Sequence, residues 1–249
     1  MNDYLKNLER IEFVVTMGCT GRCRHCSEGS HEFGGEHIDG DIAAKSVAEV
    51  CMCYDIKSLM TFGGEPLLYP DTVCCIHRAA VHAGIPEREL ITNGFFSRDS
   101  DRIKEVAIKI AESGVNRLLL SVDTFHQETI PIEPVEFFAD CIRATGLHME
   151  LSPAWLVSAE SDNPYNKKTR KLLESFERKG FVIGSGNVIF PQGNAIKFLG
   201  EYFDGSAELK NPYEDDPHDI RALCFEPNGN VLGGNIYNQS IMDIIETYR

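Results

Sequence analysis

The sequence predicts an α/β protein, an open, partial (β/α)6 barrel that continues into a short C-terminal extension. Up to about Ala195, apolar runs rich in β-branched residues alternate with amphipathic stretches, and most of these stretches end at a glycine. Strands that alternate with helices are typical of a parallel sheet. Six such units are fewer than the eight of a closed barrel, so we expect a TIM-like barrel that stays open.

Six apolar runs are the predicted strands. They cover residues 11–17, 58–62, 89–92, 117–122, 148–156 and 181–190. Ligands of parallel α/β folds bind at the carboxyl ends of the strands. The residues that follow each run are therefore the first candidates for a functional site.

Five helices are predicted between these strands. The first covers about residues 41–54, with Asp39 or Asp41 as its N-cap. The second follows Pro70, a residue suited to the first turn of a helix. The second to fifth helices end at glycines about 30 to 34 residues apart, which is the length of a βα unit. These glycines are Gly84, Gly114, Gly146 and Gly180.

The pattern changes near the C-terminus, and we assign residues 1–198 to the barrel and 199–249 to the extension. Residues 201–219 are acidic and interrupted by glycine and proline, as is typical of a loop or linker. Residues 223–232 have the pattern of a hairpin with its turn at 227–229. A short last helix is predicted over about residues 240–248.

Charge and composition exclude several classes of partner. The chain has 24 Lys and Arg against 38 Asp and Glu, a net charge of −14. Nucleic-acid binding needs a basic face, so we expect neither nucleic acid nor an anionic membrane as a partner. The charged first ten residues lack a signal core, and no run approaches the roughly 20 apolar residues of a membrane span. We therefore expect a cytoplasmic protein whose nine cysteines are reduced.

Three cysteines follow the first predicted strand within eight residues. Cys19, Cys23 and Cys26 have the spacing C-x3-C-x2-C. A structural zinc site and a cubane iron–sulfur cluster held by protein alone each need four ligands. Three thiolates on a 4Fe–4S cluster leave one iron open to a small molecule.

A second motif, Gly63-Gly64-Glu65-Pro66, follows the next strand. Its glycines let the backbone approach a ligand closely, and its carbonyls can accept hydrogen bonds from an ammonium group. The cysteine loop and this turn together resemble the radical S-adenosylmethionine (SAM) superfamily, and the resemblance covers nearly the whole chain. It implies one 4Fe–4S cluster on the three cysteines, SAM on the open iron, and the backbone of residues 63–66 at the SAM amino group.

The resemblance also implies polar cofactor contacts at later strand ends. Ser121 and Asp123, and Asn93 on the preceding strand end, are expected to meet the SAM carboxylate and ribose. A local turn stabilised by the side chain is the alternative for each of them.

The last predicted strand leads into a segment that resembles the stretch beside adenine in related enzymes. Pro191 and Gly193 carry this likeness, and Asn194 stands where many relatives have Arg. His25 stands where the family has an aromatic residue that packs near the cofactor.

Two further residues are catalytic candidates without a motif. His126 follows the fourth strand and is expected over the barrel mouth, a solvated loop histidine being the alternative. Glu150 interrupts an apolar strand, which indicates a functional or paired carboxylate with no identifiable partner. Neither residue is required as an acid or base by radical chemistry.

The other cysteines are expected to play structural roles. Five of them fall in predicted helices, where core packing explains them. Many peptide-modifying members of the family carry C-terminal extensions with further cysteines for auxiliary clusters. Here Cys224 stands alone, so we expect no auxiliary cluster and a structural or substrate-facing thiol.

The resemblance implies that the reduced cluster cleaves SAM to a 5′-deoxyadenosyl radical, which abstracts a hydrogen atom from the substrate. The C-terminal extension, residues 199–249, resembles the extensions of peptide-modifying members, which favours a peptide or protein side chain as substrate. We then expect a separate docking protein and a one-electron donor such as flavodoxin or ferredoxin. A small metabolite or nucleoside is the alternative substrate. A non-catalytic regulatory module is the other alternative, in which His25, His31 or His37 completes a Cys3His zinc site.

Overall fold

Seven parallel strands form the central sheet of the computed structural model, which describes residues 2–29, 35–203 and 215–249. The strand order is β7-β5-β4-β3-β2-β1-β9, so the sheet is open, with β7 and β9 at its edges. The strands are β1 (Arg10–Thr16), β2 (Ser58–Gly63), β3 (Glu87–Thr92), β4 (Arg117–Leu120), β5 (Met149–Leu151), β7 (Val182–Ile183) and β9 (Ala222–Phe225).

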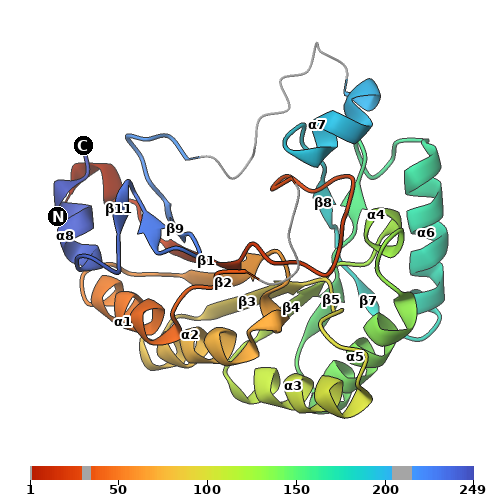
Figure 1. The fold of residues 1–249 in the computed structure, drawn as a ribbon, viewed down its shortest axis with the longest axis horizontal. Helices are drawn as coiled ribbons and strands as arrows, with labels where there is room; N and C mark the ends of the chain where they lie inside the picture. The colour runs from red at the N-terminus through yellow and green to blue at the C-terminus, as the bar shows by residue number, and fades with distance from the viewer. Residues whose placement is uncertain (1, 30–34, 204–214) are drawn as a thin grey trace.

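Five long helices cover the outer, convex side of this curved sheet (Figure 1). The Asp39 side chain accepts hydrogen bonds from the first turn of the first helix, as an N-cap does. The glycines predicted to end the other four helices all have positive φ. The helices are α1 (Gly40–Cys51), α2 (Pro70–His82), α3 (Ser100–Glu112), α5 (Ile132–Thr145) and α6 (Pro164–Glu177).

Shorter elements lie around the concave side and at the termini. They are η1 (Asp3–Leu5), η2 (Pro66–Leu68), α4 (Thr124–Gln127), β6 (Ala154–Trp155), β8 (Asn187–Val188), α7 (Asn194–Leu199), η3 (Gly200–Tyr202), β10 (Asn230–Val231), β11 (Gly234–Asn235) and α8 (Ile241–Thr247). The architecture confirms the predicted partial barrel.

Two apolar clusters hold the helices on the sheet. One lies under α3, α5 and α6 and includes Phe138 and Phe176. The other joins α1, α8 and the edge strand β9, and in it the rings of Phe13 and Phe225 stack with their centroids 4.6 Å apart. Burial of one such side chain stabilises the fold by about 2 kcal/mol. The C-terminal elements β9 and α8 therefore contribute to the core of the molecule.

Two predicted strands are divided, which is a correction to the sequence-based elements. The run at 148–156 forms β5 and β6 because Pro153 lies between them and has no N–H to donate. The run at 181–190 forms β7 and β8, and between them Gly186 turns with φ +68°. The second halves, β6 and β8, pair with each other in a separate parallel ladder.

The C-terminal turn lies where expected, since the Glu226 N–H donates to the carbonyl of Asn230. However, β9 pairs in parallel with β1, whereas β10 pairs with β11. The acidic linker predicted over 201–219 falls mainly on residues 204–214, outside the described residues, and so does His31. In the described part of the chain, no helix is long and apolar enough to span a membrane.

Candidate functional site

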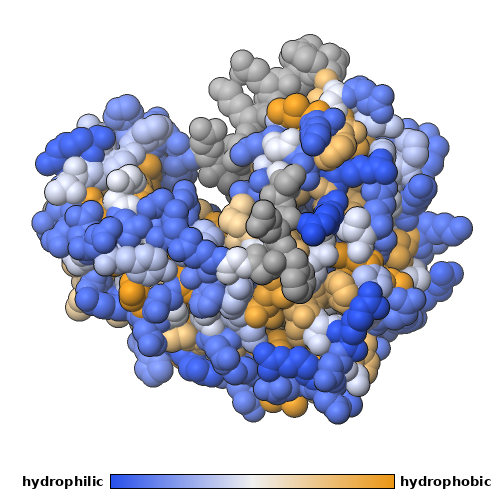
Figure 2. All heavy atoms as spheres, in the orientation of Figure 1, coloured by the Kyte–Doolittle hydropathy of each residue, from blue (hydrophilic) through white to orange (hydrophobic). Residues whose placement is uncertain are grey.

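A cavity of about 250 Å³ lies at the carboxyl ends of the strands. The strand ends contribute Gly63, Gly64, Asn93 and Ser121 to its lining. The cysteine loop, defined here as residues 18–29, forms one side and residues 187–190 form another. This is the position at which parallel α/β folds bind ligands. In the surface view, a hollow separates the lobe with β9 and α8 from the lobe with α6 and α7 (Figure 2).

The three cysteines of the loop all line this cavity. Cys19 and Cys23 are buried, and Cys26 is half-buried. Hydrogen bonds connect the loop to neighbouring elements. The Arg22 N–H donates to Thr129 Oγ1 at 3.0 Å. From β3, the Asn93 side-chain amide donates to Thr20 Oγ1 at 3.3 Å. The thiols are therefore held toward one space before any ligand binds.

The environment keeps these thiols protonated at neutral pH. Burial raises the pKa of Cys19 to about 11, and the nearby Glu65 carboxylate adds to the shift. Burial also raises the pKa of Cys23 well above its usual range, with Asp123 adding to it, and raises that of Cys26. A bound metal cluster would replace three protons by positive charge, which relieves this cost. The sulfur-only donor set fits iron–sulfur chemistry.

The two glycines of the second motif pack against neighbouring backbone, Gly64 on the cysteine loop and Gly63 on the end of β1. A Cβ built on Gly64 would lie 2.2 Å from the carbonyl oxygen of Gly18. Gly63 has φ +133°, and its Cβ would lie 2.6 Å from the Thr16 oxygen. Both glycines also line the cavity. Their lack of a side chain thus serves loop packing and leaves the backbone open to a ligand.

Glu65 and Pro66 lie behind the cavity rather than on it. One Glu65 oxygen accepts hydrogen bonds from the Leu67 N–H and the Thr92 hydroxyl, and the other accepts from the Asn93 N–H at 2.8 Å. Burial raises the pKa of Glu65 to about 7, although these hydrogen bonds oppose the shift. The contact expected here was one of the backbone, and the buried carboxylate of Glu65 instead supports Asn93.

Asp123 is likewise buried behind the cavity wall. Its Oδ1 accepts from the first N–H groups of α4, and its Oδ2 accepts from the Ala154 N–H and from His126 Nδ1 at 2.8 Å. Burial alone would raise the pKa of Asp123, but His126 brings it below the ordinary value. Burial would lower the pKa of His126, but Asp123 raises it. Asp123 therefore orients His126, which does line the cavity.

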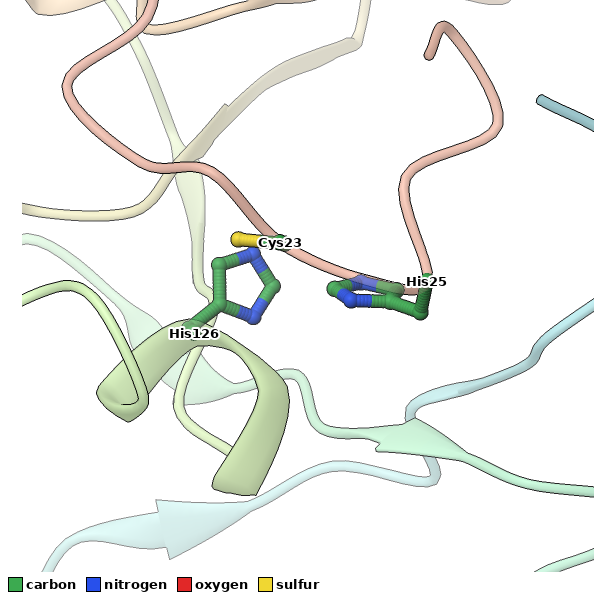
Figure 3. A group of neighbouring side chains, drawn as sticks. All are labelled: Cys23, His25 and His126. Atoms are coloured by element: carbon green, nitrogen blue, oxygen red, sulfur yellow. The ribbon is translucent and has the colours of Figure 1, made fainter. Parts of the chain in front are cut away.

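His25 and His126 face Cys23 in a compact group (Figure 3). One potential ligand atom from each of the three residues lies within 4.8 Å of the others. Burial lowers the pKa of His25 to about 4, so its ring is neutral, and its buried Nδ1 has no hydrogen-bond partner among the described residues. The ring also packs 5.1 Å from that of Phe125. An unpartnered nitrogen beside the thiols is consistent with a polar ligand in the cavity.

Of the histidines considered for a zinc site, His25 and His37 belong to the described residues, and they have different neighbours. His37 packs against Tyr69 with ring centroids 4.0 Å apart and the rings tilted by 39°. Only the group of Cys23, His25 and His126 combines histidine with a loop cysteine among the described residues, and it uses one of the three cysteines. A Cys3His zinc site therefore finds less support than a site built on the three thiols.

Glu150 has a partner that sequence reasoning could not name. Its carboxylate pairs with Arg117 at 2.6 Å, and Arg117 also pairs with Glu89 at 2.9 Å. Glu89 in turn lies 3.4 Å from Arg10. These residues form an ion-pair ladder across β1, β3, β4 and β5. Glu150 does not line the cavity, so of the two predicted roles, functional or paired, the structure shows the paired one.

The cavity wall next to Pro191 and Gly193, the residues expected beside adenine, is formed by residues that precede them. Residues 187–190 line the cavity, whereas Pro191 and Gly193 do not. Residues 152–154 line it too and were also missed, because both segments were assigned to continuous strands. The breaks at Pro153 and Gly186 are the sequence signals that could have revealed them.

Comparisons with known proteins agree with this geometry. The family model of the radical SAM superfamily matches residues 13–146. A probable GTP 3′,8-cyclase of Saccharolobus islandicus is 25% identical over 215 residues, which cover 79% of this chain and 65% of that protein. The GTP 3′,8-cyclase of Moorella thermoacetica is 27% identical over 127 residues, 50% of this chain and 38% of that protein. The chain thus spans less than two thirds of the length of these relatives.

Two solved structures share the fold. Native anSMEcpe with bound AdoMet matches with a TM-score of 0.57 and 16% identity, covering 96% of this chain and 80% of that one. BtrN in complex with AdoMet and 2-DOIA matches with a TM-score of 0.54 and 16% identity, covering 98% and 84%. At these identities the likeness supports the fold alone. Because the family model covers more than half of the sequence, the chain belongs to the radical SAM superfamily, whose enzymes use a 4Fe–4S cluster and S-adenosylmethionine.

Proposed function

We propose that Cys19, Cys23 and Cys26 hold the 4Fe–4S cluster and that SAM occupies the cavity beside them. The observation that carries this proposal is the convergence of three thiols from one loop on a cavity at the strand ends. Three sulfur ligands leave one iron position for SAM. When bound, this pair supplies a carbon radical that takes a hydrogen atom from the substrate.

The residues of the chain have separate parts in this proposal. The backbone of Gly63 and Gly64 faces the SAM amino group, and Asn93 and Ser121 supply polar contacts for its carboxylate and ribose. Residues 187–190 form the adenine side of the cavity. The side chains of Glu65 and Asp123 do not contact SAM; they hold Asn93 and His126 in place by hydrogen bonds. The walls orient the cofactor and exclude water.

For the substrate we propose a peptide or protein side chain, because the C-terminal extension resembles those of peptide-modifying members of the family. A triphosphate substrate needs unpaired cations. No Lys or Arg side chain lines the cavity among the described residues, and the chain carries a net charge of −14. The same fold in anSMEcpe is reported with a bound Cp18Cys peptide, with a TM-score of 0.57 and 17% identity. A separate docking protein and a flavodoxin or ferredoxin donor in the cytoplasm complete the proposal.

A small metabolite or nucleotide is the second candidate. It is favoured by the relatives named GTP 3′,8-cyclase, which are 25 to 28% identical to this chain. The alignment to the Saccharolobus islandicus protein extends over most of this chain, beyond the cluster motif.

Reconstitution tests the cluster and SAM assignment. We expect the protein, loaded anaerobically with iron and sulfide and reduced with dithionite, to convert SAM to 5′-deoxyadenosine. Cys23→Ala should lose both the cluster and the cleavage. Cys53→Ala, which changes an exposed cysteine away from the cavity, should retain both. Cleavage by the Cys23 variant, or a redox-silent metal in place of iron, would contradict the assignment.

The substrate class is tested by supplying each candidate to the active enzyme. We expect mass spectrometry to detect a modified side chain in a peptide encoded beside this gene when the two are co-expressed. The same protein incubated with GTP and SAM should give no cyclised nucleotide. A nucleotide product with an unchanged peptide would select the second candidate.

A further inference from the structure

Asn194, the first residue of α7, connects the cavity wall to the cysteine loop. Its backbone N–H donates to the carbonyl oxygen of Cys26 at 2.9 Å. Its side-chain amide donates to the carbonyl oxygens of Cys23 at 3.2 Å and Gly29 at 3.0 Å. One residue thus binds two of the three proposed cluster ligands through their backbone, from a position about 170 residues further along the chain.

The residue before it makes the same contact possible. Gly193 has φ +56°, a conformation that favours glycine. A Cβ built on Gly193 would lie 2.2 Å from the carbonyl oxygen of Ser27. The backbone of this segment therefore packs directly on the backbone of the loop. Two successive residues, one by close approach and one by hydrogen bonding, form the contact.

The cysteine loop needs such donors because it contains no helix or strand. Buried carbonyls outside regular structure require partners from elsewhere in the fold. At the start of the loop, the Glu65 N–H donates to the Gly18 oxygen at 2.8 Å. Asn194 provides donors for the later part, around Cys23, Cys26 and Gly29. The loop is thereby held between β2 and the segment that follows the cavity wall at 187–190.

We infer that Asn194 is a positioning residue whose side-chain amide, bound to the carbonyls of Cys23 and Gly29, sets the geometry of the loop cysteines for the cluster. This inference rests on the proposed function, because it assumes the cluster on these cysteines. The amide matters as a donor: an Asp at this position has nearly the same shape but presents only acceptors to two carbonyls. If the amide acts as a donor, Asn194→Asp should accelerate iron loss more than Asn194→Ala does. If the side chain only fills space, Asn194→Ala should be the more harmful substitution.

The experiment compares Asn194→Asp, Asn194→Ala and wild type after anaerobic reconstitution. We expect about tenfold faster loss of iron to a chelator in Asn194→Ala, since two hydrogen bonds are lost, and a larger effect in Asn194→Asp. The electron paramagnetic resonance signal and midpoint potential of the reduced cluster should also shift. Wild-type kinetics in Asn194→Asp, or greater damage in Ala than in Asp, would overturn the inference. If Asn194→Asp does not fold, Asn194→Ala decides alone, and iron loss at the wild-type rate in that variant would overturn the inference.

Asn166 offers a matched control. Its buried side-chain amide donates to the carbonyls of Leu156, Ser158 and Ser161, in a loop that does not line the cavity at those residues. Asn166→Asp should lower the melting temperature but leave the rate of iron loss per folded molecule unchanged; the same acceleration there would contradict a specific role for Asn194. Failure of the wild type to take up a cluster would refute the proposed function, whereas equal behaviour of loaded wild type and Asn194→Asp would refute this inference alone.

Discussion

Gly64 lies so close to the cysteine loop that even a methyl group has no room. In Gly64→Ala the new Cβ would meet the Gly18 oxygen at 2.2 Å, and two other backbone atoms lie within 3 Å. The loop must then move, so we expect a loss of about 1 to 3 kcal/mol in unfolding free energy. We also expect iron binding to fall well below one cluster per chain, measured by iron and sulfide analysis.

Gly200→Ala is the matched control for this prediction. A Cβ there meets nothing within 4 Å, and the backbone of Gly200 is helical. Alanine at a helical position should be neutral or stabilising by about 0.5 kcal/mol. A fully loaded, equally stable Gly64→Ala protein would show that the loop adapts without cost.

Single residues also show where prediction from sequence reaches its limit. The motif glycines and the three cysteines could be identified because their spacing along the chain is local. Glu65 and Asp123 were placed at the right strand ends, but their carboxylates turn away from the cavity to bind neighbouring N–H groups. The direction of a side chain depends on partners far away in sequence, such as Ala154 for Asp123.

At the scale of elements, the C-terminal strand β9 adds a seventh strand to the edge of the central sheet. It extends the sheet beside β1, and Phe225 is fully buried against Phe13. We expect Phe225→Ala to lower the unfolding free energy by about 3 to 5 kcal/mol, as for other large core truncations. Urea denaturation monitored by circular dichroism measures this change.

Phe198 on α7 is the comparison for Phe225. Phe198 is 48% exposed, so Phe198→Ala should change stability by no more than about 0.5 kcal/mol. A cost below about 1 kcal/mol for Phe225→Ala would show that β9 is a peripheral appendage rather than part of the core.

The helices could be predicted well and the strands less well. Amphipathic spacing and terminating glycines mark the helices locally, and Gly84, Gly114, Gly146 and Gly180 all adopt positive φ. The strands after Leu151 and Ile183 are interrupted, because Pro153 and Gly186 redirect the backbone into the separate β6–β8 ladder. Apolar composition alone does not show which strand a run will pair with.

At the scale of the whole molecule, acid stability depends on groups buried in an uncharged state. His77 is fully buried in α2, with Nε2 2.9 Å from the Thr61 hydroxyl. Burial lowers its pKa to about 3, and the charge of Arg88 adds to the shift. Its ordinary pKa is about 6.5, so below that pH the unfolded chain binds a proton that the folded protein does not. The contribution of neutral, buried His77 to the free energy of unfolding is therefore fully present above pH 6.5 and is lost as the pH falls below that value.

Between pH 7 and pH 5 this one residue should remove about 2 kcal/mol of unfolding free energy. His77→Gln keeps a hydrogen-bonding group beside Thr61 but does not titrate. Its unfolding free energy should therefore fall by about 2 kcal/mol less than that of the wild type over the same interval. Urea titrations at the two pH values measure the difference, and parallel pH profiles for the two proteins would contradict a neutral, buried His77.

The sequence by itself determined the class of fold, the cysteine loop, the glycine turn after the second strand and the family that these motifs indicate. Each motif is a short local pattern, and the alternation of strands and helices repeats with the length of a βα unit, so both can be recognised along the chain. Only the tertiary structure decided that β9 completes the sheet, that residues 187–190 form a cavity wall and that Asn194 reaches the carbonyls of Cys23 and Gly29. These contacts join residues far apart in the chain, and their geometry exists only after the sheet and helices have packed.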